Sequence, residues 1–169
     1  MTRAYLAFTE KGLALAQKLA SALPGTVARC GHGGPGLADW AAEQFAHADA
    51  LIFVGAVGIA VRAIAPHCRN KAVDPAVVVL DECGHFAVPI LSGHLGGAND
   101  LARALAAVCG AVPVITTATD ANGVFAVDAW ARHQNCAVLE PERIKRVSSR
   151  LLAGGPVRYR SGSPVAGQA

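Results

Sequence analysis

Residues 76–99 have the sequence AVVVLDECGHFAVPILSGHLGGAN, and the order of apolar and polar residues in this stretch decides the fold. Two apolar runs, 77–80 and 86–91, are separated by the short polar turn 81–84, a pattern that predicts a β-hairpin. The small-residue loop 92–97 then precedes a helix-forming segment. Backbone N–H groups at such a strand-to-helix loop can bind a ligand, so the stretch also contains a candidate site.

The composition indicates a small α/β protein. Of the 169 residues, 53% are hydrophobic and only 5% are aromatic, as expected where small helices pack on a buried parallel sheet. No apolar run reaches the roughly 18 residues that cross a bilayer. Residues 1–4 lead directly into a strand-like run without the features of a secretory signal. We therefore expect a soluble, cytoplasmic protein that binds no membrane.

Charge and cysteine usage exclude several function classes. A formal net charge of +3 is too small to indicate a nucleic-acid partner. Basic residues gather near the C-terminus without interleaved aromatic residues, which predicts a solvated helix face. The five cysteines are dispersed without C-x-x-C spacing, so we expect reduced, mostly buried thiols rather than a zinc site or disulfides.

Strands and helices alternate along the N-terminal half. The pattern predicts strands over 3–8, 26–30 and 50–54, the last of them buried on both faces. Helices are predicted after a cap at Thr9, over 37–48, and from residue 59 to a stop at Pro66.

The C-terminal half continues the alternation. After the hairpin we expect a helix over 98–108, a buried strand over 112–116, a helix over 125–133, a strand over 136–139 and a basic helix over 141–152. The predicted fold is a three-layer α/β/α, Rossmann-like open sheet, mostly parallel but mixed because of the hairpin. One domain is expected over 1–153, followed by a linker-like tail over 154–169.

Three Gly-rich or polar segments each follow a predicted strand: 55–58, 92–97 and 116–122. In an open α/β sheet, ligands bind beyond the carboxyl ends of the strands. We therefore expect these three segments to gather on one rim of the sheet and to form a shared polar pocket.

Two residues on this predicted rim are candidates for proton transfer. His94 stands among small residues, where its imidazole can act as an acid or base or as a metal ligand; the alternative is a loop histidine bonded to nearby backbone. Asp120 can serve as a general base or orient His94; the alternatives are an Asx turn or a helix cap. The elbow motif G-x-S-x-G is absent from the sequence, so serine-hydrolase chemistry is not indicated.

Other residues on the rim are candidates for binding a polar ligand. Arg62 lies about one turn into a predicted helix on an otherwise apolar surface, where either a structural salt bridge or a ligand carboxylate explains it. Asp81, Glu82 and His85 at the hairpin turn are expected to be solvated. The remaining candidates are Gly55, Gly58, Ser92, Gly93, Gly96, Gly97, Asn99, Thr116, Thr117, Thr119 and Asn122.

Three motifs resemble one family. They are FVGAVGIAVRAIAP at 53–66, DPAVVVLDECGHFAVPILSGHLGGANDLA at 74–102 and PVITTATDANGVFAVDAWA at 113–131. Their sequence and order resemble the CbiG family, the cobalt-precorrin-5A hydrolases of anaerobic cobalamin biosynthesis. The first fifty residues are compatible with the family but contain little of its signature.

The resemblance implies a reaction and a set of partners. The reaction is opening of the δ-lactone of cobalt-precorrin-5A, with loss of acetaldehyde, to give cobalt-precorrin-5B. This acidic tetrapyrrole carries its own cobalt, so no separate cofactor or metal is expected. His94 or Asp120 would move the proton and the amides of Gly93, Gly96 and Gly97 would face the developing charge. An axial cobalt ligand is the competing role for His94.

The resemblance also implies a further C-terminal domain, beyond the 169 residues of this sequence. That domain, in cis or in trans, is therefore an expected partner, and a homodimer is left open. Two hypotheses follow: an active hydrolase, or a non-catalytic corrinoid-binding half that needs the other domain. A flavodoxin-like flavin or nucleotide binder is a third hypothesis. It is disfavoured because the sequence shows no phosphate-binding signature and few aromatic residues.

Overall fold

The computed structural model describes residues 1–158 and 160. The chain divides into two compact units, Met1–Ile115 (unit 1) and Thr116–Ala169 (unit 2). The domain predicted over 1–153 therefore contains residues of both units. Of the predicted tail over 154–169, residues 159 and 161–169 lie outside the described residues.

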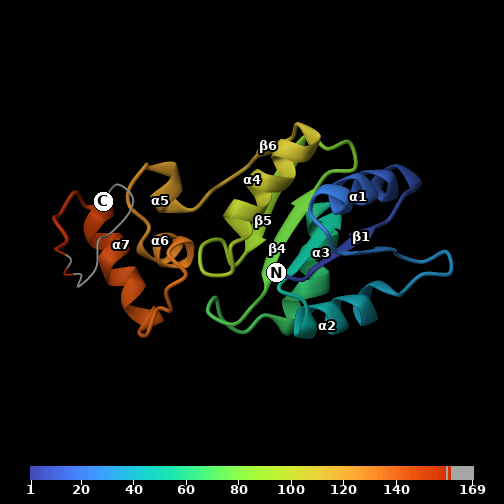
Figure 1. The fold of residues 1–169 in the computed structure, drawn as a ribbon. Coiled ribbons are helices and arrows are strands. Elements are labelled where there is room, and N and C mark those ends of the chain that lie inside the picture. The colour runs from blue at the N-terminus through green and yellow to red at the C-terminus, as the bar shows by residue number, and fades with distance from the viewer. Residues whose placement is uncertain (159, 161–169) are drawn as a thin grey trace. The chain divides into compact units, whose positions relative to one another are not determined.

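Unit 1 is built on a six-stranded sheet with the strand order β2-β1-β3-β4-β5-β6 (Figure 1). The strands β1 to β4 run parallel to one another, β5 runs antiparallel to β4, and β6 runs parallel to β5. The strand bounds are Arg3–Ala7 (β1), Thr26–Arg29 (β2), Ala50–Val54 (β3), Ala76–Leu80 (β4), Phe86–Leu91 (β5) and Val112–Pro113 (β6).

Helices cover both faces of this sheet. The helices α1 (Glu10–Ala22) and α4 (Ala98–Cys109) pack on one face. The helices α2 (Leu37–His47) and α3 (Val57–Ile64), the latter extended by the 3₁₀ turn η1 (Ala65–His67), pack on the other (Figure 1). The predicted three-layer α/β/α architecture with a mixed sheet is confirmed.

The two central strands, β3 and β4, are buried over their whole length because a layer of helices covers each face of the sheet. Successive side chains of a strand point to opposite faces. Ile52 and Val78 accordingly pack under α1 and α4, whereas Leu51 and Val77 pack under α2 and α3. Burying a side chain of this size contributes about 1.5–3 kcal/mol.

The hairpin turn between β4 and β5 is held by one carboxylate. Asp81 accepts hydrogen bonds from the backbone N–H groups of Cys83 (3.0 Å), His85 (2.9 Å) and Phe86 (2.8 Å). Partial burial of Asp81 raises the pKa of its carboxyl, but the three N–H donors and the neighbouring His85 outweigh that effect, and the pKa is lowered. The turn that reverses the chain is therefore fixed by hydrogen bonds from its own backbone to the Asp81 side chain.

The start of α1 is also tied to this turn. Thr9 caps the helix as predicted, because its hydroxyl oxygen accepts the backbone N–H of Gly12 at 3.0 Å. The same hydroxyl donates to the Glu82 carboxylate at 2.6 Å. Residues 73 positions apart in the sequence thus meet where β1 and β4 end.

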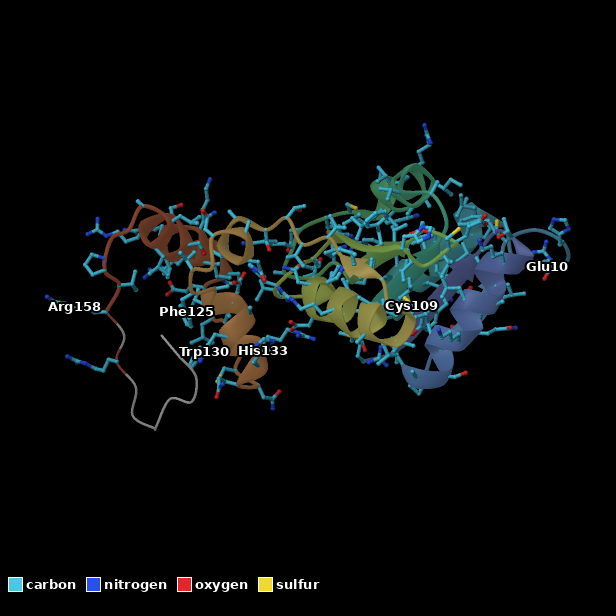
Figure 2. All side chains as sticks on the ribbon, turned by 90° about the horizontal axis from the view of Figure 1, so that it is seen from above. Glu10, Cys109, Phe125, Trp130, His133 and Arg158 are labelled. Carbon is cyan, nitrogen blue, oxygen red and sulfur yellow. The ribbon has the colours of Figure 1, made fainter. Side chains whose placement is uncertain are left out.

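Unit 2 is helical in its described part. Its elements are α5 (Ala118–Ala121), α6 (Val127–His133), the 3₁₀ turn η2 (Pro141–Arg143) and α7 (Ile144–Leu152), with α7 packed against α5 and α6. Figure 2 labels Phe125 and Trp130, whose ring centroids lie 6.1 Å apart. The basic side chains at 143, 145, 146 and 150 are exposed, which confirms a solvated face.

The structure corrects three sequence-based expectations. The strand predicted at 112–116 is the short β6, with Val112 57% exposed, because β6 is an edge strand that contacts only β5. The strand predicted at 136–139 is irregular, and Leu139 is 92% exposed. All five cysteines are free as expected, but Cys68, Cys83 and Cys136 are exposed rather than buried.

The helices of the described chain are all too short, or not apolar enough, to cross a lipid bilayer.

We predict that Asp49→Ala destabilises unit 1 at neutral pH and that this effect disappears in acid. The Asp49 carboxylate accepts the backbone N–H of Thr2 at 2.6 Å, which fastens the start of β1 beside β3. This bond is the main cause that lowers the pKa of Asp49. The stabilisation is thus complete above the usual pKa of 3.8 and is lost as the pH falls through the lowered value.

Urea unfolding followed by far-UV circular dichroism at pH 7 and about pH 3 measures this effect. Because the Asp49 side chain is 60% exposed, the loss at pH 7 should stay below about 1 kcal/mol. Glu43→Ala, which removes an exposed carboxylate from α2, is the matched control. An equal loss for Asp49→Ala at both pH values would contradict the prediction.

Candidate functional site

The direction of β5 separates two of the predicted ligand loops. The strands β1 to β4 all end at one edge of the sheet, here called the carboxyl edge, and begin at the other, here called the amino edge. Val54 ends β3 at the carboxyl edge, and the 55–58 loop follows it. Leu91, at the end of β5, pairs with Val77 near the start of β4, so the 92–97 loop follows at the amino edge.

The prediction that the loops gather on one rim is therefore wrong for this pair. A strand of five residues is about 17 Å long, so the two loops lie at opposite ends of the sheet. The rule that ligands bind at carboxyl ends holds for parallel strands, and β5 is antiparallel to β4. The third segment, 116–122, belongs to unit 2 and is described separately.

The turn at the amino edge is unusually constrained. Ser92 has φ +54°, in the left-handed region that side chains other than glycine rarely adopt. The residue is only 8% exposed, and its hydroxyl donates to the backbone carbonyl of Asp74 at 2.9 Å. A Cβ added at Gly96 would lie 2.4 Å from the Ser92 Cβ, so the position accepts no side chain. Backbone strain of this kind gathers at functional sites.

Three backbone N–H groups at the end of the turn already donate hydrogen bonds inside the protein. The N–H of Gly97 donates to the His94 carbonyl (3.0 Å), that of Ala98 to Ser92 (3.1 Å) and that of Asn99 to Gly93 (3.0 Å). Gly97 caps α4 with φ +84°, and Asn99 is buried in the first turn of the helix. The Gly97 amide, predicted to face a developing charge, is therefore already hydrogen-bonded inside the protein.

His94 lies within this turn and is partly buried. The surrounding hydrogen bonds fix its backbone, so its imidazole is attached to a rigid turn rather than to a mobile loop. Imidazole is the side chain whose usual pKa lies nearest to neutral pH. The position is suited to proton transfer or to ligation of a metal that a substrate carries.

The 55–58 loop at the carboxyl edge has a different character. Gly55 lies against Phe8, since a Cβ there would approach the ring at 2.7 Å. Gly58 is exposed in the first turn of α3. Arg62 is also exposed, and its guanidinium donates to the Gly58 carbonyl at 3.3 Å, rather than forming the salt bridge that the sequence left open.

The 116–122 segment contains a short helix instead of an open loop. Thr117 stands at the N-cap of α5, and its hydroxyl donates to the Asp120 carboxylate at 2.6 Å. The Asn122 side chain donates to the Ala118 carbonyl at 2.8 Å. Thr119 is buried and Thr116 is exposed. His94 and Asp120 belong to different units, so an Asp120 that orients His94 stays a prediction.

Comparisons with known proteins identify the region that contains these residues. Residues 39–120 match the family described as Cobalamin synthesis G N-terminal. A cobalt-precorrin-5A hydrolase from Salmonella typhimurium is 43% identical over 161 residues, which cover 88% of this chain. The chain belongs to the CbiG family. A second cobalt-precorrin-5A hydrolase, from Priestia megaterium, is 41% identical over 60% of the chain.

The chain spans about half the length, or less, of the CbiG relatives that it matches: 45% of the Salmonella protein and 27% of the Priestia protein. A crystal structure of a cobalamin biosynthesis protein G homolog from Sulfolobus solfataricus has the same fold, with a TM-score of 0.58 at 22% identity. That similarity covers 96% of this chain and 51% of the other.

The contacts that hold the turn around His94 were not apparent from the sequence. Asp74 is 93% buried and accepts the backbone N–H of Arg69 through both carboxylate oxygens, at 3.1 and 3.0 Å. Its carbonyl receives the Ser92 hydroxyl, so the loop before β4 supports the turn after β5. An Asp-Pro pair directly before a strand was the available signal, but nothing in the spacing linked it to Ser92.

We predict opposite effects of alanine substitution at two candidate glycines of this chain. Gly96→Ala places a Cβ 2.4 Å from the Ser92 Cβ and should cost about 1–3 kcal/mol of stability. Gly58→Ala places a Cβ 3.4 Å from the Arg62 guanidinium, an ordinary contact. Because alanine favours helix, Gly58→Ala should be neutral or stabilising by up to about 1 kcal/mol.

Urea midpoints for the two variants and the wild type measure the difference. A Gly96→Ala protein as stable as the wild type would show that the turn can relax around a side chain.

Proposed function

We propose that this chain forms the N-terminal part of a cobalt-precorrin-5A hydrolase. The observation that supports this proposal is 43% identity to such an enzyme across 88% of the chain. The proposed substrate is cobalt-precorrin-5A, an acidic tetrapyrrole that carries cobalt. No separate cofactor is needed for a hydrolysis whose metal arrives with the substrate.

The proposed reaction uses one water and releases acetaldehyde. Water adds to the lactone carbonyl and the ring C–O bond breaks, which leaves a carboxylate and an alcohol. The alcohol then loses its proton and becomes the aldehyde of the two-carbon fragment as the C–C bond to the macrocycle breaks. The electron pair and a proton return to the macrocycle, which gives cobalt-precorrin-5B. The enzyme must therefore supply a base for water and stabilise an oxyanion.

His94 is the residue of this chain that we propose as the base. The strained and glycine-dependent turn around it supports the assignment, because such a turn holds a reacting group at a fixed place. An axial contact between His94 and the substrate cobalt is the alternative role. Asp120 stays a second candidate for the proton, paired with the Thr117 hydroxyl.

The substrate-binding residues follow from the same proposal. Those near His94 are Ser92, Gly93, Gly96, Gly97 and Asn99, and those of unit 2 are Thr116, Thr117, Thr119 and Asn122. Three candidates lie at the other edge of the sheet, opposite His94, and are therefore the weaker candidates for substrate binding: Gly55, Gly58 and Arg62. We also propose that the protein is cytoplasmic. The proposal is compatible with either a monomer or a homodimer.

The alternative function is a non-catalytic corrinoid-binding half that becomes active only with a C-terminal domain. The match to the Salmonella relative covers 45% of that protein, so the alternative assigns the chemistry to the part outside the match. The two functions differ in one measurement: acetaldehyde released from cobalt-precorrin-5A by the chain alone, and by the chain with the C-terminal region of the Salmonella relative added.

We predict that His94→Ala lowers acetaldehyde release by about 100-fold or more, the usual effect of removing a general base. Corrinoid binding, followed by the absorption spectrum of the substrate, should stay unchanged. His47→Ala removes an exposed histidine from the last turn of α2 and is the matched control.

A spectral shift on binding that is present in the wild type and lost in His94→Ala would instead assign His94 as the cobalt ligand. Wild-type turnover by His94→Ala would remove the residue from the mechanism. Absence of both turnover and binding, with the C-terminal region present, would overturn the proposed function.

A further inference from the structure

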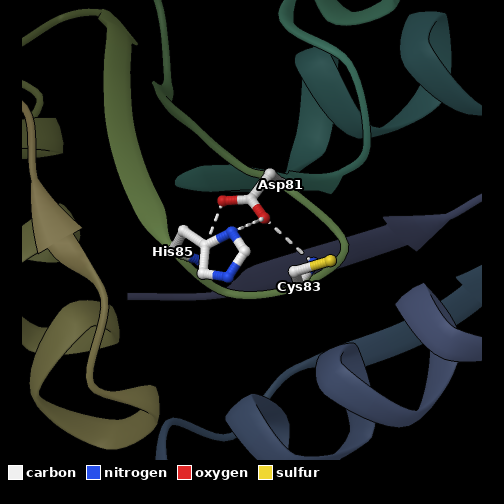
Figure 3. A group of neighbouring side chains, drawn as sticks. All are labelled: Asp81, Cys83 and His85. Carbon is white, nitrogen blue, oxygen red and sulfur yellow. Dashed lines mark hydrogen bonds and ion pairs between the residues drawn. The ribbon is translucent and has the colours of Figure 1, made fainter.

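Three side chains with metal-binding atoms gather at the hairpin turn, at the edge of the sheet opposite His94. They are Asp81, Cys83 and His85, and their ligand atoms all lie within 4.8 Å of one another. Figure 3 shows the Asp81 carboxylate between the His85 imidazole and Cys83. None of the three has a role in the proposed hydrolysis.

The spacing of these atoms is close to that of a zinc site. Ligands at the corners of a tetrahedron around Zn²⁺ lie about 3.3–3.6 Å from one another, given Zn–N and Zn–O distances near 2.0 Å and a Zn–S distance near 2.3 Å. The Asp81 Oδ1 and His85 Nδ1 atoms are already 3.4 Å apart. Cys83 and His85 are exposed, so a shift of about 1 Å brings the sulfur into range.

The turn holds the three residues in place before any ion arrives. Asp81 accepts three backbone N–H groups, including those of Cys83 and His85 themselves. The pairing of Leu80 with Ala87 closes the hairpin on either side of the turn. The backbone entropy lost on binding is therefore small, because the folded hairpin has already lost it.

The donor set selects the class of metal. One thiolate, one imidazole and one carboxylate suit Zn²⁺ and neighbouring first-row ions, whereas Ca²⁺ and Mg²⁺ prefer sites made of oxygen atoms. Three protein ligands leave the fourth tetrahedral position for water, as in open zinc sites.

A positive group already lies beside the sulfur. The Lys11 ammonium, from α1, donates to the Cys83 sulfur at 2.9 Å. The sulfur thus accepts from a cation supplied by a second element of the fold. The Lys11 side chain is exposed and can withdraw when a metal takes its place.

We propose that Asp81, Cys83 and His85 bind one Zn²⁺ ion at the hairpin turn, with water as the fourth ligand. The sequence argued against a zinc site built from cysteines alone, because no C-x-x-C pair is present. This site needs one cysteine and draws its other ligands from the same turn. It is separate from the proposed hydrolase chemistry and is tested without the corrinoid.

The test is metal binding by the purified, chelator-treated chain. Zn²⁺ is titrated in competition with a chromophoric chelator, and Co²⁺ serves as a spectroscopic probe, because thiolate ligation gives it a charge-transfer band in the near ultraviolet. We expect one ion per chain and a thiolate band with Co²⁺. Cys83→Ser should weaken Zn²⁺ binding by about tenfold or more and remove the band.

Three further variants sharpen the result. Cys68→Ser removes another exposed thiol, one that contacts the Ile64 carbonyl, and should change neither the affinity nor the band. Lys11→Gln removes the cation that competes for the sulfur and should tighten Zn²⁺ binding by a few-fold. His85→Gln should weaken binding while leaving the thiolate band in place at saturating Co²⁺.

Either of two results overturns the site. One is the absence of Zn²⁺ binding at about 100 μM, which is far weaker than zinc sites in proteins. The other is an affinity that is the same in the wild type and in Cys83→Ser, because the ion would then bind elsewhere on the chain. Circular dichroism of each variant shows whether the hairpin is still folded.

Discussion

The antiparallel pairing of β5 with β4 is the constraint on which the arrangement of the sites depends. Leu80 faces Ala87 and Val77 faces Leu91, so the chain runs back across the sheet within a dozen residues. The turn that directly follows β4 lies at the carboxyl edge, and the loop that directly follows β5 lies at the amino edge. The metal-binding atoms of the hairpin and the His94 turn are neighbours in sequence and lie at opposite edges in space.

The two edges differ in how they are built. The amino edge depends on backbone contacts that leave little freedom: Ser92 bonds to the Asp74 carbonyl, and Gly96 lies against Ser92. The carboxyl edge depends on side-chain contacts between elements, made by the exposed Lys11 and the half-buried Glu82. Fixed backbone suits a residue that must meet one reacting atom. Exposed side chains suit a ligand that arrives and leaves.

Much of the fold was predictable because the pattern of apolar residues along the chain indicates which faces of a helix or strand are buried. The continuous apolar run at 50–54 predicted a strand covered on both faces, and that strand is the buried β3. Thr9 was predictable as a cap from its residue type alone. The strand at 136–139 failed because a short apolar run predicts a strand only where a neighbouring strand can pair with it.

The candidate site was less predictable than the fold. The loop at 92–97 was recognisable from its small residues, but its place was not, because the loop rule assumes parallel strands. The antiparallel hairpin, which the sequence does predict, reverses the direction of β5 and so moves this loop to the amino edge. The support from Asp74 was out of reach, because a contact from a side chain to a distant carbonyl leaves no periodic signal. Two demands meet at position 92: a left-handed backbone and a hydroxyl that donates to the Asp74 carbonyl. Glycine would relieve the backbone strain but has no hydroxyl, and a bulkier residue would neither fit the buried position nor make this hydrogen bond. Serine is therefore the compromise that closes the turn.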